Sequence, residues 1–243
     1  MIEAGIGLMD GDRNGPEHTS WDCYHEHPAT SSMCMFRRID PFWQIAPEPF
    51  PAGDLVVDVW RLPPLADESL PLREQAHRAR SALLAMYVGV PADALRIDCR
   101  PGGKPYLRPP LDDLEFNLSH CNDLALLAVS RAIPLGIDVE GERKLSDPLR
   151  LARRVFDEQS LASLLATPQP QRSQKFIELW TWMEARQKAL GRGIFADSVD
   201  PATVHSLSFP AGSRHVACLS LTRPVDTAAL RFFELAKSAA PSS

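Results

Sequence analysis

The sequence predicts an α+β fold built from two similar units, because β-rich segments and amphipathic helical patterns recur in the two halves of the chain. In the first half, an apolar, β-branched run over 55–60 precedes a helical pattern over 72–88. In the second half, a helical pattern over 173–190 precedes apolar runs over 204–209 and 215–221. Two such units in succession predict internal pseudo-twofold symmetry.

Turn and cap residues bound the elements of the first half. A Pro63-Pro64 pair ends the first strand, and Gly89 is the expected C-cap of the helix. The apolar face of that helix is predicted to hold Ala79, Leu83, Met86 and Tyr87. Further strand segments are indicated by their apolar content: 95–99, 104–107, 124–129 and 135–139, the last two expected to be central.

The second half carries similar signals. Asp147 is a plausible N-cap with Pro148 at the first helical position, and that helix is expected to end near Phe156. The longer helix is predicted to stop at Gly191. Its inner stripe holds Phe176, Leu179, Trp180, Met183, Gln187 and Leu190. A turn over 210–212 is expected between the two final strands.

Composition restricts the class of function. The chain has 243 residues, 44% hydrophobic and 23% charged, which fits one large or two small globular domains. Its net charge of −5 shows no basic excess, so neither nucleic acid nor a membrane is an expected partner. No apolar run approaches the roughly 18 residues of a membrane span.

The chain divides by pattern into a lead and two subdomains. Residues 1–52 are polar, without a sustained period, and are expected to be poorly ordered, with His25-Glu26-His27 solvated rather than metal-binding. Subdomains are predicted over 53–134 and 135–243. The five cysteines contain no C-x-x-C pair and no secretory signal is visible, so a reducing cytoplasm without disulfides or zinc is expected.

Asp138 and Glu140 form the first candidate site. In the strand pattern over 136–140, residues two apart point to one face, so both carboxylates project together. Adjacent carboxylates repel unless a cation lies between them, and oxygen ligands suit Mg²⁺. The same pattern also fits an edge strand with two solvated acids.

Three other motifs offer groups that bind phosphate. Glu184 and Lys188 are spaced i, i+4, which fits either a surface ion pair or a metal carboxylate beside a phosphate-binding ammonium. Ser119 and His120 either cap a turn or donate hydrogen bonds to phosphate, and they lack the G-x-S-x-G elbow of serine hydrolases. Lys104 is a point charge between rigid neighbours, outside any P-loop motif.

Together these motifs resemble the 4′-phosphopantetheinyl transferases, in the larger, pseudo-dimeric class that includes the surfactin-synthetase-activating enzyme. The matching motifs are GGKPYL at 102–107, FNLSH at 116–120, GIDVE at 136–140 and W-x-x-x-E-A-x-x-K-A-L-G-x-G over 180–193. The resemblance implies a monomer that transfers the 4′-phosphopantetheine group of coenzyme A to a serine of an acyl or peptidyl carrier protein. The active site would lie at the interface of the two subdomains, and 3′,5′-ADP would be released.

By position, the resemblance also implies a role for each motif residue. Asp138, Glu140 and Glu184 look like the carboxylates for Mg²⁺, with Glu184 also the base and Lys188 beside the transferring phosphate. Coenzyme A contacts are implied for Arg80, Lys104, Ser119 and His120. Arg78 is an alternative to Arg80, because the alignment slides along this helix.

Two departures from the family pattern leave rival functions open. Met183 stands where the family usually has lysine, although it continues an apolar stripe and is expected to pack in the core. The segment between Trp60 and Arg80 is also shorter than usual. A degenerate relative that binds coenzyme A or a carrier without transfer is therefore an alternative, and a Mg²⁺-dependent phosphodiesterase is a third. A net charge of +4 over 141–192 predicts a docking surface for an acidic carrier.

Overall fold

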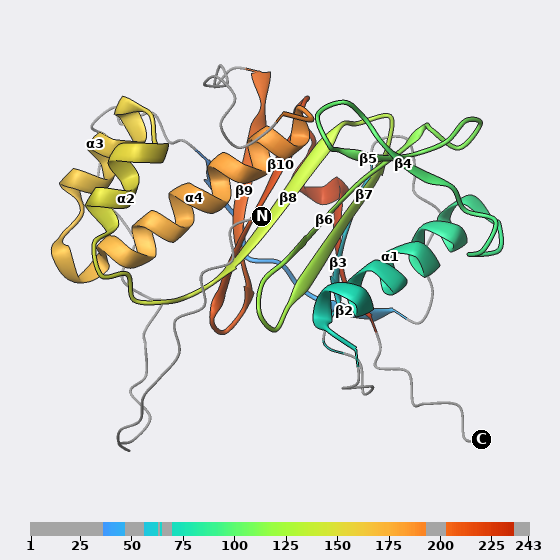
Figure 1. The fold of residues 1–243 in the computed structure, drawn as a ribbon, viewed down its shortest axis with the longest axis horizontal. Helices are drawn as coiled ribbons and strands as arrows, with labels where there is room; N and C mark the ends of the chain where they lie inside the picture. Colours follow the sequence, from blue (N-terminus) through green and yellow to red (C-terminus); the bar gives the residue numbers. More distant parts are fainter. Residues whose placement is uncertain (1–35, 47–55, 63, 65–69, 193–202, 236–243) are drawn as a thin grey trace. The chain divides into compact units, whose positions relative to one another are not determined.

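The computed structural model describes residues 36–46, 56–62, 64, 70–192 and 203–235. All of them belong to one compact unit, Cys34–Ser243, in which helices cover β-sheets (Figure 1). The predicted α+β class is thus confirmed, while the His25-Glu26-His27 cluster lies outside the described residues. Among the helices that the structure describes, none is long and apolar enough to span a membrane.

The larger sheet has five strands in the order β2-β11-β3-β7-β6. Its strands are β2 (Gln44–Ala46), β3 (Val57–Leu62), β6 (Leu114–His120), β7 (Ala125–Arg131) and β11 (Leu230–Leu235). β11 pairs in parallel with β2 and β3, and the remaining pairs are antiparallel. The C-terminal strand therefore lies inside a sheet whose other long strands come from the first half of the chain.

The second sheet has four strands in the order β1-β9-β10-β8. They are β1 (Arg37–Arg38), β8 (Leu135–Gly141), β9 (His205–Gly212) and β10 (His215–Leu221), and a separate ribbon pairs β4 (Ile97–Cys99) with β5 (Pro105–Leu107). β8 ends the hydrogen-bonded ladder, so it is not a central strand of this sheet as the sequence pattern predicted. The chain enters it from β7 through a turn at Ala132, where φ is 54°.

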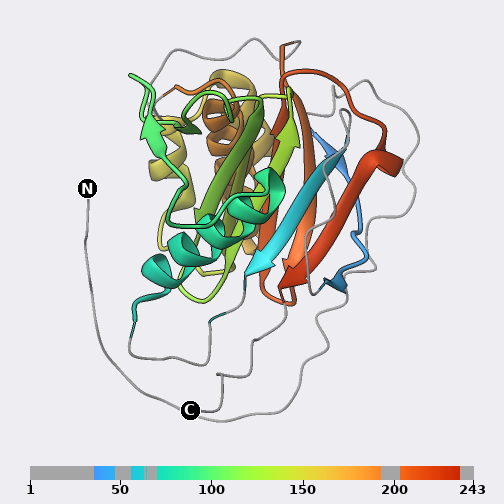
Figure 2. The same ribbon diagram turned by 90° about the vertical axis from the view of Figure 1, so that its right-hand side faces the viewer.

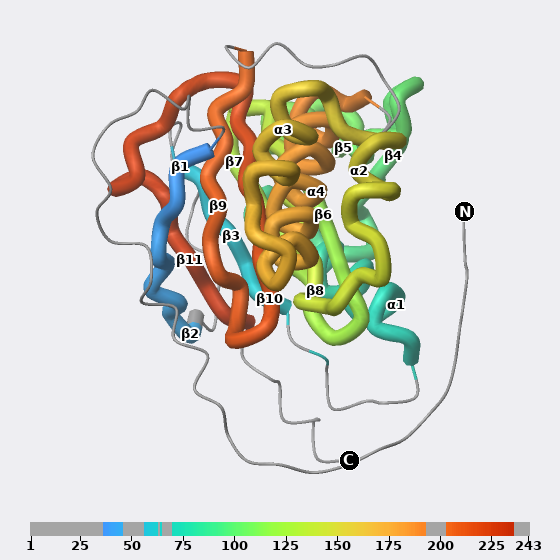
Figure 3. The backbone as a smooth tube through the Cα atoms, turned by 90° about the vertical axis from the view of Figure 1, so that its left-hand side faces the viewer, coloured from blue at the N-terminus to red at the C-terminus, as the bar shows by residue number. Residues whose placement is uncertain are grey.

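The two sheets face each other across an inner core, and each has one long helix on its outer face (Figures 2 and 3). Helix α1 (Leu72–Val88) packs on the five-stranded sheet and α4 (Arg172–Ala189) on the four-stranded sheet. Helices α2 (Pro148–Val155) and α3 (Glu158–Ala166) pack on α4. Side chains of β11 alternate between two apolar layers: Phe232 lies in the inner core, and Phe233 packs in the layer under α1.

Helix boundaries follow the sequence signals closely. Gly89 adopts the left-handed conformation at φ 69° after α1, and the Asp147 side chain accepts a hydrogen bond from the Arg150 amide at 2.9 Å before α2. Both caps were predicted. Met86, however, is 48% exposed, so its predicted place on the buried face of α1 is wrong.

Several elements differ from the prediction or were not predicted. β9 continues through the expected turn over 210–212, and the chain reverses after Gly212. A register shift at this point of the β9–β10 ladder leaves Ala211, next to Pro210, without a partner on β10. Helix α3 was missed although Asp157 caps it by accepting a hydrogen bond from Ser160 N at 2.8 Å. β1 and β2 fall inside the stretch 1–52 that was expected to be a lead, and β11 was also missed.

Side chains of β6 join this strand to β8 across the junction of the two sheets. The Ile137 amide donates to the Asn117 side-chain oxygen at 2.8 Å, and the Val139 amide donates to the Ser119 hydroxyl oxygen at 3.4 Å. Two residues of the FNLSH motif thus satisfy backbone donors that a neighbouring strand would otherwise pair. These side-chain hydrogen bonds fix the position of β8 relative to β6.

Gly136 sets the distance between β8 and α4. A Cβ atom at this position would lie 2.2 Å from the Ala185 carbonyl oxygen and 2.3 Å from the Ala189 amide nitrogen, so only glycine permits this approach. Gly102 similarly lies against the Gly191 carbonyl, where a Cβ would stand 1.9 Å away. The backbone of α4 and of the loop after it therefore rests directly on two motifs of other segments.

A buried charged network ties β11 to β3 and α1. Asp58 is fully buried and accepts hydrogen bonds from the Arg231 guanidinium at 2.7 and 2.8 Å and from the Tyr87 hydroxyl at 2.5 Å. The Trp60 indole donates in turn to the Tyr87 oxygen at 2.8 Å. Burial, followed by the charge and hydrogen bond of Asp58, raises the pKa of Tyr87, so the phenol stays a donor.

The Arg231→Met variant tests this network. It leaves the Asp58 carboxylate buried without a cation, so we expect the free energy of unfolding to fall by about 3–5 kcal/mol in urea denaturation. The matched control is Arg223→Met, an exposed arginine with one long bond to the Ala132 carbonyl, for which we expect a change within about 0.5 kcal/mol. Equal stability of Arg231→Met and the native chain would show that Asp58 does not need this cation.

The Gly136→Ala variant tests the close approach of β8 and α4. Because the added methyl group meets backbone atoms that cannot rotate away, we expect a loss of about 1–3 kcal/mol in the free energy of unfolding. Gly141→Ala is the control on the same strand, since its Cβ would meet only the His215 ring, at 3.8 Å. If both variants unfolded at the same urea concentration, the close approach at Gly136 would not constrain the fold.

Candidate functional site

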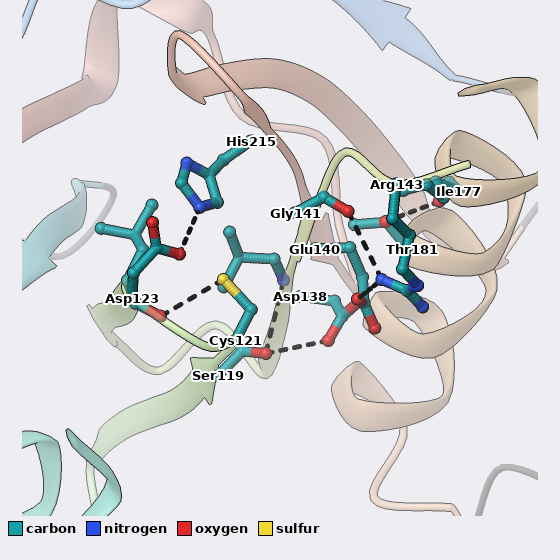
Figure 4. Close-up of polar contacts among 12 residues, drawn as sticks. Ser119, Cys121, Asp123, Asp138, Glu140, Gly141, Arg143, Ile177, Thr181 and His215 are labelled. Carbon is teal, nitrogen blue, oxygen red and sulfur yellow. Dashed lines mark hydrogen bonds and ion pairs between the residues drawn. The ribbon is translucent and has the colours of Figure 1, made fainter. Parts of the chain in front are cut away.

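Asp138 is the centre of a polar cluster where β8, β6 and α4 meet. Its side chain is 4% exposed, and its Oδ1 accepts hydrogen bonds from Lys188 Nζ at 2.6 Å and from the Ser119 hydroxyl at 2.8 Å. Figure 4 shows Ser119 directed at Asp138 from the neighbouring strand. Strand alternation explains the placement, because Ile137 and Val139 point into the inner core and turn Asp138 toward α4.

Lys188 connects two carboxylates of different elements. Its ammonium lies 2.6 Å from Asp138 Oδ1 and 3.3 Å from Glu184 Oε2, so the two acids approach the same point. The Glu184 and Lys188 side chains are only 12% and 27% exposed. The i, i+4 spacing on α4 therefore builds part of a shared cluster and not a solvated surface pair.

The protonation of Glu184 reflects this crowding. Burial, and then the negative charges of Asp138 and Glu140, raise the pKa of Glu184 to about 7, although Lys188 acts in the opposite direction. The pKa of Lys188 is raised: burial alone would lower it, but the carboxylates of Asp138 and Glu184 outweigh that effect. Lys188 therefore stays charged while Glu184 exchanges a proton near neutral pH.

Glu140 lies on the same face of β8 as Asp138 and at the edge of the cluster. It accepts an ion-pair hydrogen bond from Arg143 at 2.7 Å and is 21% exposed (Figure 4). Its charge is close enough to raise the pKa of Glu184. The carboxylates of Asp138, Glu140 and Glu184 thus form one electrostatic group, as the alternation on β8 predicted for the first two.

The cluster has an unused acceptor. Asp138 Oδ2 is buried and has no hydrogen-bond partner among the described residues. A buried, unpaired carboxylate oxygen is costly, and a bound cation would satisfy it. Oxygen donors from three carboxylates are the set that Mg²⁺ prefers, so these residues fit that ion.

Basic residues lie between α1 and the end of β6. Burial, and then the charges of Arg80, Arg73 and His120, lower the pKa of His77. The pKa of His120 is also lowered, first by partial loss of hydration and then by Arg73 and Lys188. His77 was not predicted as a member of this basic group. The spacing of residues 73, 77 and 80 along one helix face would have indicated that they lie together.

Arg80 and Arg78 differ in their surroundings. Arg80 has a buried Nε without a partner among the described residues, and burial lowers its pKa. Arg78 is exposed and pairs with Glu74 one turn away at 2.9 Å. Of the two alternatives that the sequence left open, Arg80 is the one with free hydrogen-bonding capacity toward the basic group.

Lys104 is placed at the end of α4. It is 8% exposed, with Nζ 3.1 Å from Glu115 Oε2 and 3.4 Å from the Ala189 carbonyl oxygen. Its ammonium therefore holds the 101–104 turn against the helix terminus, where a cation also complements the helix dipole. Met183 packs, as expected, against the apolar cluster under α2 and α3.

The comparison with known protein families matches a segment in the second half of the chain. Residues 134–236 match the family model described as the 4′-phosphopantetheinyl transferase superfamily. This range contains Asp138, Glu140, Glu184 and Lys188. It also contains β8, α4 and β11, so it includes strands of both sheets.

Curated relatives carry the same description. The chain is 39% identical over 115 residues to the 4′-phosphopantetheinyl transferase HetI of Nostoc sp., which is 46% of this chain and 48% of that protein. It is 31% identical over 129 residues to the 4′-phosphopantetheinyl transferase Sfp of Bacillus subtilis, which is 50% of this chain and 55% of that protein. A third relative is the 4′-phosphopantetheinyl transferase psf-1 of Bacillus pumilus, 33% identical over 115 residues, 47% of each chain.

The chain thus spans about half the length of the curated relatives it matches. The range matched by the family model nevertheless contains Asp138 and Glu184, which meet at the Lys188 ammonium, and Glu140 at the edge of the cluster. The resemblance predicted from the sequence motifs is therefore confirmed: residues 134–236 match the model of the 4′-phosphopantetheinyl transferase superfamily, and the similar proteins are named as such transferases.

Proposed function

We propose that this chain transfers the 4′-phosphopantetheine group of coenzyme A to a serine of an acyl or peptidyl carrier protein, releasing 3′,5′-ADP. The observation that carries the proposal is the convergence of Asp138, Glu184 and Lys188 around a buried, unpaired carboxylate oxygen. The family match covers all three residues. Phosphoryl transfer needs positioning and charge neutralisation, and this cluster offers both.

Asp138, Glu140 and Glu184 would hold Mg²⁺, which when bound neutralises negative charge on the pyrophosphate of coenzyme A. The carrier serine oxygen forms the new bond to phosphorus, and the bond from phosphorus to 3′,5′-ADP breaks. Glu184 takes the proton of the serine hydroxyl, directly or through water, as the carboxylate that α4 holds beside Lys188. Lys188 stabilises the charge that develops on the phosphate oxygens.

The basic group beside this cluster is the proposed seat of the nucleotide. Arg80, Ser119 and His120 are the expected contacts with the nucleotide. We add His77, because its ring lies close enough to Arg80 and His120 for their charges to lower its pKa, after the larger effect of burial. Ser119 has a second task, since its hydroxyl already orients Asp138. For Lys104, the contact with coenzyme A stays a prediction beside its ion pair with Glu115.

The arrangement of the chain is part of the same proposal. The proposed subdomains are 53–134 and 135–243, related by a pseudo-twofold axis with the active site at their interface, and the lead over 1–52 adds β1 and β2 to the two sheets. Support comes from the two sheets, each with one long helix outside it, and from Asp138 and Ser119 contributing from different sheets. A monomer in the cytoplasm, with neither nucleic acid nor membrane as partner, completes the proposal.

The rival functions make different predictions for the same residues. A degenerate relative would bind coenzyme A or a carrier without transfer, and Met183 in place of the usual lysine is the observation that favours it. Retention of three carboxylates and Lys188 favours catalysis instead. A phosphodiesterase would release 3′,5′-ADP without any carrier.

An activity assay with coenzyme A, Mg²⁺ and an apo carrier protein tests the proposal. The carrier should gain the mass of the phosphopantetheine arm, and chelation of Mg²⁺ should abolish the gain. Asp138→Asn should lower the rate by about 10²-fold or more, because it weakens both the cation site and the Lys188 pair. The control is Asp112→Asn, an exposed acid without an ion pair in the described part of the chain, whose rate should stay within about twofold.

Three outcomes would contradict the proposal. Binding of coenzyme A without a mass gain would identify the non-catalytic relative, and release of 3′,5′-ADP without a carrier would identify the phosphodiesterase. An undiminished rate in Asp138→Asn, with Mg²⁺ present, would place the chemistry elsewhere.

A second experiment tests the docking of the carrier. Arg150, Arg153 and Arg154 on α2 are exposed and form no ion pairs with other described residues, so they are available to an acidic partner. Changing all three to Glu should raise the KM for the carrier and flatten its salt dependence, while the KM for coenzyme A stays unchanged. Equal increases in both KM values would assign the arginines to the nucleotide or to the fold, and no change in either would place the docking surface elsewhere.

A further inference from the structure

A second group of potential metal ligands lies beside β8. Cys121 and Asp123 lie in the turn between β6 and β7, and His215 is the first residue of β10. One ligand atom of each residue lies within 4.8 Å of those of the other two (Figure 4). We propose that these three side chains bind a transition-metal ion of the Zn²⁺ class, at a site separate from the carboxylate cluster.

The fold brings these residues together from distant parts of the chain. The Cys121 amide donates to the Leu124 carbonyl at 2.9 Å, which closes the tight turn that carries Cys121 and Asp123. His215 pairs with Gly141 in the β10–β8 ladder, and side chains of β6 join β6 to β8. The end of β10 is therefore held next to the β6–β7 turn by the same contacts that fix Asp138.

The three side chains are partly prearranged. His215 is 14% exposed, and its Nε2 lies 2.8 Å from Asp123 Oδ1. Its ring lies between two glycines, Gly141 and Gly212, and a Cβ at Gly212 would approach Nδ1 to 3.4 Å. Cys121 is half-buried, with Sγ 3.6 Å from the Leu124 carbonyl oxygen, whereas Asp123 is 68% exposed and free to adjust.

The donor set selects the class of ion. Sulfur, imidazole nitrogen and carboxylate oxygen are together typical of Zn²⁺ and related ions, whereas Mg²⁺ prefers oxygen ligands alone. Ligand atoms around tetrahedral Zn²⁺ lie about 3.5 Å apart, given bond lengths of about 2.0–2.3 Å, so closure needs shifts of roughly 1 Å. Three protein ligands leave a fourth position for water or an external ligand.

Binding of the ion changes the protonation of its ligands. The Cys121 thiol releases its proton to solvent and binds as thiolate. His215 binds through Nε2 with its proton on Nδ1, and the ion replaces the present hydrogen bond between His215 and Asp123. The bound ion thus replaces two hydrogen bonds, that of His215 with Asp123 and that of the Cys121 thiol with the Leu124 carbonyl, with three ligand bonds.

The site is distinct from the carboxylate cluster by geometry. On β8, Asp138 and Glu140 face α4, while Gly141, the ladder partner of His215, belongs to the opposite set of the strand alternation. In Figure 4, Asp138 and Glu140 lie between this group and α4. The two sites therefore share β8 but take different ions.

Titration of the metal-free full chain with Co²⁺, a spectroscopic substitute for Zn²⁺, tests the inference. We expect a thiolate-to-cobalt charge-transfer band that saturates at one equivalent, is displaced by Zn²⁺ and persists in excess Mg²⁺. Cys121→Ser should abolish the band. Asp123→Ala, which changes an exposed side chain, should weaken Co²⁺ binding by about tenfold or more while leaving the fold intact.

Two controls separate this site from other groups. Cys99→Ser changes an exposed cysteine outside the cluster and should leave the band unchanged. Glu184→Gln should also leave it unchanged, because this residue of α4 belongs to the carboxylate cluster and its side chain pairs with Lys188, not with Ser119. A band that survives in Cys121→Ser, or that disappears in Glu184→Gln, would overturn the inference, as would the absence of stoichiometric binding by the native chain.

Discussion

Helix α4 lies so close to β8 that no side chain fits between them at Gly136. This contact between the two backbones places the Glu184 and Lys188 side chains of α4 close to Asp138 on β8. The distances of 2.6 and 3.3 Å from the Lys188 ammonium to the two acids depend on it. A larger residue at 136 would separate the strand that carries two carboxylates from the helix that carries the third.

The junction between the sheets supplies the other half of the positioning. Asn117 and Ser119 bridge β6 to β8 with their side chains, and Ser119 also donates to Asp138. The same hydroxyl therefore serves the fold and the site. A serine that aligns a carboxylate in this way does not need to touch a substrate to matter for the reaction, so its removal would act on the geometry of Asp138 as well as on any ligand contact.

Local patterns in the sequence predicted the parts of the structure that depend on local physics. The end of α1 followed from Gly89, the start of α2 from Asp147, and the shared face of Asp138 and Glu140 from the two-residue period of a strand. The convergence of Glu184 with Asp138 was implied only by the family resemblance, because nothing local links a helix to a strand 46 positions earlier.

Several of the features that were not predicted are non-local. β11 pairs in parallel with β3, although β3 begins at Val57 and β11 only at Leu230, so no turn signal between neighbouring segments predicts the pairing. Met86 shows the limit of periodicity, since an apolar residue at the right spacing still lies 48% exposed. Cys121 and His215 carry no spacing motif because the ladder between β8 and β10, and not their neighbours in sequence, brings them together.

The ammonium of Lys188 acts as a tethered counter-ion for the carboxylates of Asp138 and Glu184. Because it is covalently attached, its effective concentration at Asp138 is far higher than that of a free cation in solution. Under the function proposed above, a divalent ion at the carboxylates would compete with this intramolecular cation and would free the Lys188 ammonium for the phosphate. Binding of a cation to the carboxylates would thus be coupled to the release of the Lys188 side chain from its ion pairs.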